Sequence, residues 1–313
     1  MSASAQGSVR LREVGLRDGL QSIAQVMPTA AKLAWIDAEF AAGVREIEVC
    51  SFVPARLMPQ FVDAPDVVRH ALGLEGLTVA ALVPNARGAE NALALGVPKL
   101  NYVTSASESH NRANVRRTRA ESLDGFRQVA RLAAGTGTGL AGGVSTAFGC
   151  TIEGAVPHEA VLDLVRAYLD AGACEIVLGD TVGYADPASI RRLLERVLPV
   201  AGDAPVALHL HDTRGLGLAN VVAGLDMGIR HFDASLGGMG GCPHAPGASG
   251  NIVTEDAAFL LQAMGWDTGI DIPALLRVRD VIRQALPDVE LLGAMARAGL
   301  PLGHPGARAP APH

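Results

Sequence analysis

The chain has 313 residues, of which 49% are hydrophobic and only 4% aromatic. This length suits an α/β barrel, which takes about 250 residues plus additions, and a core of small aliphatic side chains favours layered strands and helices over a sandwich packed on aromatic rings. The net charge of −6 argues against a nucleic-acid-binding protein, which normally presents a basic surface, but leaves room for local basic positions near a phosphate.

The N-terminus and the cysteines indicate a protein of the reducing cytosol. Residues 1–10 are short and polar, without signal- or transit-peptide features, and no run of eighteen apolar residues predicts a membrane span. The four cysteines are widely spaced and form no C-x-x-C pair, so neither a zinc ribbon nor a disulfide framework is expected. We therefore expect a cytoplasmic protein in which one thiol is available for chemistry.

Helices that end in glycine and are followed at once by a short apolar strand recur along the chain. The glycines are Gly43, Gly96, Gly172 and Gly228, and glycine just past a helix accommodates the left-handed conformation that closes the last turn. Amphipathic spacing predicts helices between the strands, for example at 161–168 after Pro157. The eight predicted strands are Arg10–Val14, Arg45–Val49, Leu77–Val83, Lys99–Thr104, Gly139–Ala147, Cys174–Leu178, Val206–Leu210 and Arg230–Ser235.

Eight strands alternating with helices predict a (β/α)8 TIM barrel of the α/β class. An open dinucleotide-binding sheet is disfavoured because no G-x-G-x-x-G follows the first strand. We expect a single domain over 1–302, with the barrel at about 9–265, a helical extension at about 271–300 and a disordered tail at 303–313. The active site of such a barrel lies at the C-terminal ends of its strands, so the polar residues there are the candidates.

The first and seventh strands end in groups that suit a metal site. Arg17 and Asp18 lie between two glycines, and they form either a plain surface turn with a local ion pair or a carboxylate ligand beside an oxyanion-holding guanidinium. His209 and His211 point to the same side of a strand because side chains alternate. Two histidines at this spacing at a strand end favour metal ligation over a structural role.

A glycine-rich loop at 237–251 follows the eighth strand. It is either a flexible connector or a mobile lid that carries Cys242 over the site, and a thiol at its centre favours the lid. Asn251 ends the loop shortly before a predicted helix from Thr254. It is either the N-cap of that helix or a ligand through its side-chain oxygen.

Other polar residues near the strand ends give weaker signals. Glu48 and Asp180 end the second and sixth strands, and Ser51 lies just beyond the second; each has either a catalytic or an orienting role. We expect His110, in a loop after the fourth strand, to face solvent. The nearby arginines are candidates for phosphate contacts, although a solvated cluster is the default expectation for them: Arg112, Arg116, Arg117 and Arg119.

The candidate ligands combine two imidazoles, one carboxylate and one amide oxygen: Asp18, His209, His211 and Asn251. This set suits Mg²⁺ or Mn²⁺ and does not exclude Zn²⁺ or Fe²⁺. Such an ion lowers the pKa of a substrate hydroxyl, and the resulting alkoxide can expel an enolate. Arg17 is placed to stabilise the enolate oxygen and Cys242 to protonate its carbon, which together describe a retro-aldol or retro-Claisen lysis.

Several segments resemble the 3-hydroxy-3-methylglutaryl-CoA lyase family of metal-dependent barrels. They are Glu13–Gln21, Ile47–Val53, His209–Thr213 and the loop that holds Cys242 and Asn251, within a resemblance from about Val9 to about Gly265. The resemblance implies a divalent cation on the four ligands named above, Arg17 at the thioester carbonyl and Cys242 as the catalytic thiol. It also implies supporting catalytic roles for Glu48 and Asp180, proton transfer by His209, and substrate binding that includes Gln21 and Ser51.

The chain departs from that family at residues around the expected substrate. It has Leu16 where the family usually has proline, and His244 where the family usually has an aromatic residue. Residues 22–25 are Ser-Ile-Ala-Gln, whereas the family usually has Asn-Glu and a nearby lysine. Residues 109–112 are Ser-His-Asn-Arg, whereas the family's loop is usually apolar and then basic. The expected reaction is cleavage of 3-hydroxy-3-methylglutaryl-CoA to acetyl-CoA and acetoacetate, as in leucine degradation, by a homodimer. The alternatives are a lyase for a related acyl-CoA such as citramalyl-CoA, an aldolase on a free hydroxy-keto acid, and a catalytically silent CoA or metabolite sensor.

Overall fold

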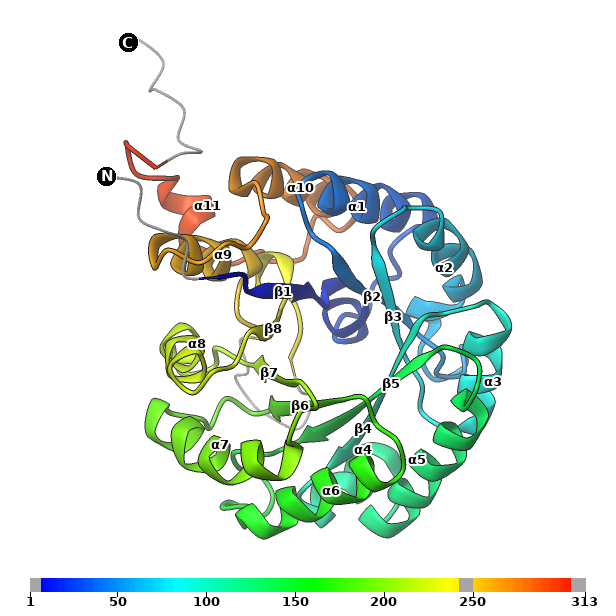
Figure 1. The fold of residues 1–313 in the computed structure, drawn as a ribbon. Coiled ribbons are helices and arrows are strands. Elements are labelled where there is room, and N and C mark those ends of the chain that lie inside the picture. The colour runs from blue at the N-terminus through cyan, green and yellow to red at the C-terminus, as the bar shows by residue number, and fades with distance from the viewer. Residues whose placement is uncertain (1–6, 242–249, 305–313) are drawn as a thin grey trace, which may run out of the picture.

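The structure, a computed structural model, describes residues 7–241 and 250–304. Within them, eight parallel strands form a closed barrel in the order β1 to β8, with helices around its outside (Figure 1). The strands are β1 Arg10–Glu13, β2 Glu46–Ser51, β3 Thr78–Leu82, β4 Lys99–Ser105, β5 Gly139–Ser145, β6 Glu175–Asp180, β7 Val206–Leu210 and β8 His231–Ala234. The predicted (β/α)8 barrel is confirmed, and each predicted strand overlaps an observed one.

The helices follow the predicted alternation with the strands. They are α1 Thr29–Ala41, α2 Ala64–Leu72, α3 Ala86–Ala94, α4 Glu108–Val115, α5 Arg119–Ala133, α6 His158–Asp170, α7 Pro187–Ala201, α8 Gly217–Asp226, α9 Thr254–Ala263, α10 Ile272–Ala285 and α11 Ala294–Ala298. Three short turns complete the set: η1 Gly15–Gly19, η2 Pro59–Phe61 and η3 Leu236–Gly238. Among these described helices, none has the length and apolar content that crossing a bilayer requires.

The strand register determines which side chains enter the barrel. β1 closes the barrel against β8, with Leu11 opposite Phe232, and β4 pairs with β5 over seven residues that end with Ser105 opposite Ser145. Because side chains alternate along a strand, every second residue of β4 to β8 points inward. The outward residues form the apolar core between the sheet and the helices, with Phe126 and Tyr168 among the large side chains that are fully buried there.

An ionic layer fills the barrel below its C-terminal mouth. Lys99 Nζ lies 2.6 Å from both Glu46 Oε1 and Glu175 Oε2. Arg12 forms an ion pair with Glu175 and donates to Asp233 Oδ1 at 2.5 Å. Each charge in this layer therefore has an opposite partner, which buried ions require because they have lost their water.

The segment after β4 differs from the prediction. Residues 108–115 form helix α4 rather than a loop, because Ser107 caps the helix by accepting a hydrogen bond from the backbone N–H of His110. The side chain of His110 is only 1% exposed, so the expectation that it faces solvent is wrong. The ring turns back toward β4, where Nδ1 lies 2.7 Å from Ser105 Oγ.

Candidate active site and metal centre

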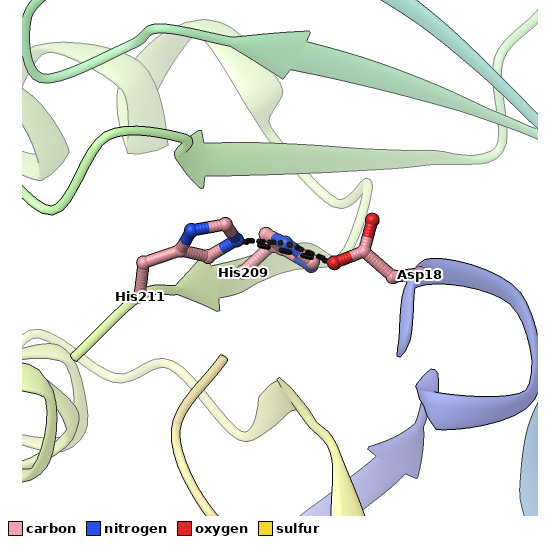
Figure 2. Close-up of side chains that lie close together, drawn as sticks. All are labelled: Asp18, His209 and His211. Carbon is pink, nitrogen blue, oxygen red and sulfur yellow. Dashed lines mark hydrogen bonds and ion pairs between the residues drawn. The ribbon is translucent and has the colours of Figure 1, made fainter. Parts of the chain in front are cut away.

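Asp18, His209 and His211 come together at the C-terminal mouth of the barrel (Figure 2). The two Nε2 atoms lie 3.1 Å apart, and Asp18 Oδ2 lies 3.9 Å from His209 Nε2 and 4.0 Å from His211 Nε2. Ligands on adjacent positions of an octahedral ion with bonds of about 2.1 Å lie roughly 3 Å apart, so a small inward movement of Asp18 fits one. The spacing therefore matches a site for a divalent cation.

Local structure explains how these three side chains converge. His209 and His211 follow the alternation of β7 into the barrel mouth. Asp18 lies on η1, a single π-helical turn directly after β1, and the side chains of Arg17 and Asp18 are only 12% exposed. The alternative of a plain surface turn at Arg17-Asp18 is therefore wrong. π-Helical turns are rare and occur mostly at functional sites.

Asn251 completes a four-residue set. An isolated antiparallel bridge pairs it with His211, and its Nδ2 donates to Asp18 Oδ2 at 2.7 Å. Its Oδ1 is buried without a hydrogen-bond partner among the described residues, as expected of a group that awaits a cation. A Cβ at Gly240 would lie 2.4 Å from Asn251 Nδ2, so only glycine leaves room here. Helix α9 is capped by Val253 rather than by Asn251, which excludes the N-cap alternative.

The electrostatics favour the metal-binding protonation states of Asp18 and His211, whereas in the absence of an ion they favour protonation of His209. Burial lowers the pKa of His211 to about 4, so its imidazole is neutral near pH 7. Burial alone would raise the pKa of Asp18, but the nearby charges of Arg17 and the two histidines outweigh it and lower the pKa. For His209, burial acts to lower the pKa, whereas the hydrogen bond to Asp233 and the charge of Asp18 raise it overall.

Asp233 holds the first histidine, and the sequence analysis missed it. Its Oδ2 lies 3.1 Å from His209 Nδ1, and its other oxygen accepts from Arg12. A carboxylate on the second nitrogen of a metal-binding histidine fixes the ring and strengthens it as a ligand. The signal available in the sequence was strand alternation, since Asp233 lies two residues after His231 on β8 and shares the inward face.

Glu48 orients Arg17. Glu48 Oε2 accepts a hydrogen bond from Arg17 Nε, and its Oε1 accepts from Asn101 Nδ2 at 2.8 Å. Arg17 Nη1 donates to Asp18 Oδ1 at 2.7 Å. Two carboxylates thus hold the guanidinium beside the metal centre, and its Nη2 donates to none of the described residues. Asn101, like Asp233, is an inward residue that the sequence analysis did not select.

A cavity of about 610 Å³ opens from this group of residues. It extends from the metal centre over the ends of β2 to β6 toward α4. Gln21 lines it, in keeping with its predicted contact with substrate, which stays a prediction. Arg116 and Arg117, two of the predicted basic residues, line its outer part.

The remaining predicted site residues are absent from the lining of the cavity or lie outside the described residues. Asp180 Oδ1 accepts from the backbone N–H of Tyr184 at 2.7 Å, and burial raises the pKa of Asp180 to about 6. Ser51 is fully buried and its hydroxyl accepts from the N–H of Val53. Neither is among the residues that line the cavity. Cys242 lies outside the described residues, so its role stays a prediction.

Comparison with known proteins places this geometry in a family. The sequence profile of the HMGL-like family matches residues 8–282. The chain is 42% identical to the hydroxymethylglutaryl-CoA lyase YngG of Bacillus subtilis, with 89% of this chain and 93% of that protein covered. It is 40% identical to the hydroxymethylglutaryl-CoA lyase of Pseudomonas mevalonii, with 96% and 99% covered.

A solved structure agrees in fold. It is an HMG-CoA lyase from Acinetobacter baumannii in complex with coenzyme A and 3-methylmalate, 38% identical, with both chains fully covered and a TM-score of 0.90. A family profile over most of the chain and relatives at about 40% identity over nearly their whole length show the family. The chain belongs to the hydroxymethylglutaryl-CoA lyase family.

Proposed function

We propose that the protein is a divalent-metal-dependent carbon–carbon lyase that cleaves 3-hydroxy-3-methylglutaryl-CoA to acetyl-CoA and acetoacetate. The observation that carries this proposal is the convergence of Asp18, His209 and His211 beside the guanidinium of Arg17, in a cavity large enough for an acyl group. The relatives at about 40% identity bear the name of this lyase. A silent sensor is disfavoured because the proposed ligands are all present in one place.

We assign the metal ligands as Asp18, His209, His211 and Asn251, with Mg²⁺ or Mn²⁺ as the ion. Oxygen and imidazole ligands without thiolate suit these ions. When bound, the ion supplies a Lewis acid that lowers the pKa of the substrate's C3 hydroxyl. The buried, unpaired oxygen of Asn251 supports this assignment.

The side chains around the proposed metal site take up the hydroxyl proton and stabilise the enolate. His209, whose Nδ1 faces Asp233, presents Nε2 to the cavity; it would help to hold the ion and is also the candidate group for uptake of the hydroxyl proton. As the C2–C3 bond breaks, its electron pair forms the enolate of acetyl-CoA. Arg17, held by Glu48, stabilises the enolate oxygen, a type of contact typically worth about 10²–10³ in rate.

Cys242 completes the reaction in this proposal by donating its thiol proton to C2. The proton removed from the hydroxyl restores the thiol, so the reaction balances without a co-reactant. Asp180 holds the turn after β6 through the backbone N–H groups of Tyr184 and Ala185, which is a supporting role. The predicted substrate contacts are Gln21, which lines the cavity, and Ser51, which is buried outside its lining.

The test is acetyl-CoA release from a panel of substrates with and without chelator. We expect turnover of 3-hydroxy-3-methylglutaryl-CoA that EDTA abolishes and that Mn²⁺ or Mg²⁺ restores. Preferential turnover of citramalyl-CoA, or of free hydroxy acids only, would replace the proposed substrate by one of the alternatives. Cys242→Ala should lose at least about 10²-fold in kcat while binding Mn²⁺ normally. A variant as active as the parent would remove the thiol from the mechanism.

We also propose that the enzyme works in the cytoplasm as a homodimer, with residues 1–302 as one domain. Helices α10 and α11 lie outside the barrel and are the candidate contact surface (Figure 1). Light scattering coupled to size exclusion tests the oligomeric state, and a monomer at micromolar concentration would contradict it.

A further inference from the structure

The charged side chains inside the barrel do not balance one another. Eight of them, among the described residues, point inward from the strands or lie on η1, and none of these side chains is more than 12% exposed. They comprise three cations and five carboxylates, namely Arg12, Arg17 and Lys99 against Asp18, Glu46, Glu48, Glu175 and Asp233. With both histidines neutral, as ligation requires, three positive and five negative charges leave a net charge of −2.

Charges just outside this set do not cancel the excess. Arg10 reaches Glu46 at 3.5 Å, but its side chain is 50% exposed, so water screens its charge. Glu13 is an outward residue of β1 whose pKa burial raises to about 8, and burial also raises the pKa of Glu39 on α1, so both favour the neutral form near pH 7. Glu255 on α9 is paired with an arginine of α10 at 2.6 Å. The excess negative charge therefore belongs to the interior of the barrel.

Buried contacts join this excess charge to the proposed metal centre. Lys99 Nζ lies 2.6 Å from Glu175 Oε2, and Glu175 forms an ion pair with Arg12. Arg12 donates to Asp233 Oδ1 at 2.5 Å, and Asp233 Oδ2 lies 3.1 Å from His209 Nδ1. A change of charge in the ionic layer thus reaches His209 through buried side chains, where salt and water screen it far less than at a surface.

The separation is short enough for the layer to act on a cation. Lys99 lies one inward position deeper on β4 than Asn101, whose Nδ2 contacts Glu48 at the edge of the metal centre. Inward positions of a strand are about 6.6 Å apart, which places the layer on the order of 10 Å from the proposed ion. At that distance one unit charge changes the affinity for a divalent cation by about 4-fold in water, and by more than about 100-fold at an effective dielectric constant of about 20.

We propose that the ionic layer sets the affinity of the metal centre through its charge, with Glu46 and Glu175 strengthening the binding of a divalent cation and Lys99 weakening it. This inference rests on the metal centre of the proposed function and not on its substrate. Among the described residues, none of the three forms an ion pair with a proposed ligand, so each acts on the ion through its electric field. Buried charge is costly unless an opposite charge accompanies it, and a divalent cation leaves the interior neutral.

Charge-removing variants test the proposal by the direction in which Mn²⁺ affinity changes. Calorimetric titration of metal-free protein with Mn²⁺, without substrate, measures the Kd. We expect Glu46→Gln to weaken binding roughly 10-fold, Lys99→Gln to tighten it by a similar factor, and the double variant to return to about the wild-type value. The single variants leave the remaining charges paired, since Lys99 retains Glu175 when Glu46 is replaced, and Glu46 retains Arg10 when Lys99 is replaced. Glu90→Gln, in a surface ion pair on α3, is the matched control and should keep the wild-type Kd.

Opposite directions distinguish a charge effect from a structural one, because a loosened barrel would weaken Mn²⁺ binding in both variants. Weaker binding in both, or an unchanged Kd in both, would overturn the proposal. Thermal melting of the metal-free variants shows that they are folded, and Glu175→Gln, which leaves Lys99 paired with Glu46, takes the place of Glu46→Gln if the latter does not fold. Wild-type Mn²⁺ binding that ignores these charges would overturn this inference alone, whereas a wild-type protein that binds no Mn²⁺ would overturn the metal centre of the proposed function as well.

Discussion

At the scale of single residues, Asp233 fixes the ring of His209, which is a proposed metal ligand. Its Oδ2 lies 3.1 Å from His209 Nδ1, and the carboxylate is itself held by Arg12. Burial would raise the pKa of Asp233, but the charge of Arg12 and the bond to His209 hold it well below its usual range. The carboxylate is therefore ionised throughout the neutral range.

Replacing this carboxylate by an amide should weaken the metal centre. We expect Asp233→Asn to lower Mn²⁺ affinity by about 10- to 100-fold, because the amide keeps the shape but loses the negative charge that strengthens the imidazole. Titration of metal-free protein, followed by the paramagnetic resonance of free Mn²⁺, measures the change. Asp226→Asn is the matched control, since Asp226 pairs with Arg191 at the surface. Wild-type affinity in Asp233→Asn would contradict the coupling.

The sequence identified residues whose spacing or neighbours carry a signal by themselves. His209 and His211 share a face through strand alternation, and Asp18 follows the first strand beside Arg17. Asn101 and Asp233 lie on the inward faces of β4 and β8, where a functional polar residue is indistinguishable from a structural one until the barrel closes. Their roles depend on partners on other strands, Glu48 and His209, which no local pattern contains.

At the scale of elements, one buried carboxylate joins the turn that carries Asp18 to the segments after β8. Glu13 Oε1 accepts from the N–H groups of Gly15 at 2.7 Å and Leu236 at 3.0 Å, and its Oε2 lies 2.7 Å from Thr254 Oγ1. Burial raises the pKa of Glu13 from 4.5 to about 8. The folded protein thus favours the protonated form.

This shift makes stability depend on pH in a direction opposite to that of a paired carboxylate. Between pH 4.5 and about 8 the unfolded chain releases the proton of Glu13 while the folded chain retains it, so stability falls as pH rises through this window. We expect Glu13→Gln to flatten that decline, by an amount on the order of a few kcal/mol at pH 8. Urea unfolding at pH 5 and pH 8 measures it, with the exposed Glu75→Gln as control. Equal slopes in Glu13→Gln and wild type would refute the account.

Strands that follow a glycine at a helix end were predictable from the sequence, whereas elements whose residues also favour turns were not. The helix–glycine–strand repeat indicated the four strands that follow Gly43, Gly96, Gly172 and Gly228, because a glycine with a positive φ can close a helix, as Gly43 does at 100°. Helix α4 was missed because Ser, Asn and His in 105–111 favour turns. The cap at Ser107 followed by Glu108 was the signal for a helix. The π-turn η1 has no sequence pattern of its own.

At the scale of the whole molecule, the proposed metal centre joins distant parts of the chain. Asp18 and Asn251 are 233 residues apart in sequence yet share a hydrogen bond. An ion held by both binds the folded chain and not the unfolded one, so it should stabilise the entire barrel.

Loading the ion should raise the melting temperature. At a free Mn²⁺ concentration one hundred times its Kd, the expected gain is about 2.7 kcal/mol, enough for an increase of a few degrees. Scanning fluorimetry of EDTA-treated protein with and without Mn²⁺ measures it. His211→Ala, which removes one of the ligands, should show no such increase, and a wild-type protein indifferent to Mn²⁺ would argue against the assigned site.

The ionic layer of Arg12, Glu46, Lys99 and Glu175 determines from which end of the barrel the cavity can be reached. Because these side chains fill the interior of the barrel below the cavity, we expect substrate to enter and both products to leave at the C-terminal mouth. An acyl-CoA whose long arm occupies that mouth also shuts out bulk water. The bound substrate would thus limit the access of solvent to the cavity. The carbanion formed there would then be protonated by groups of the protein rather than by water.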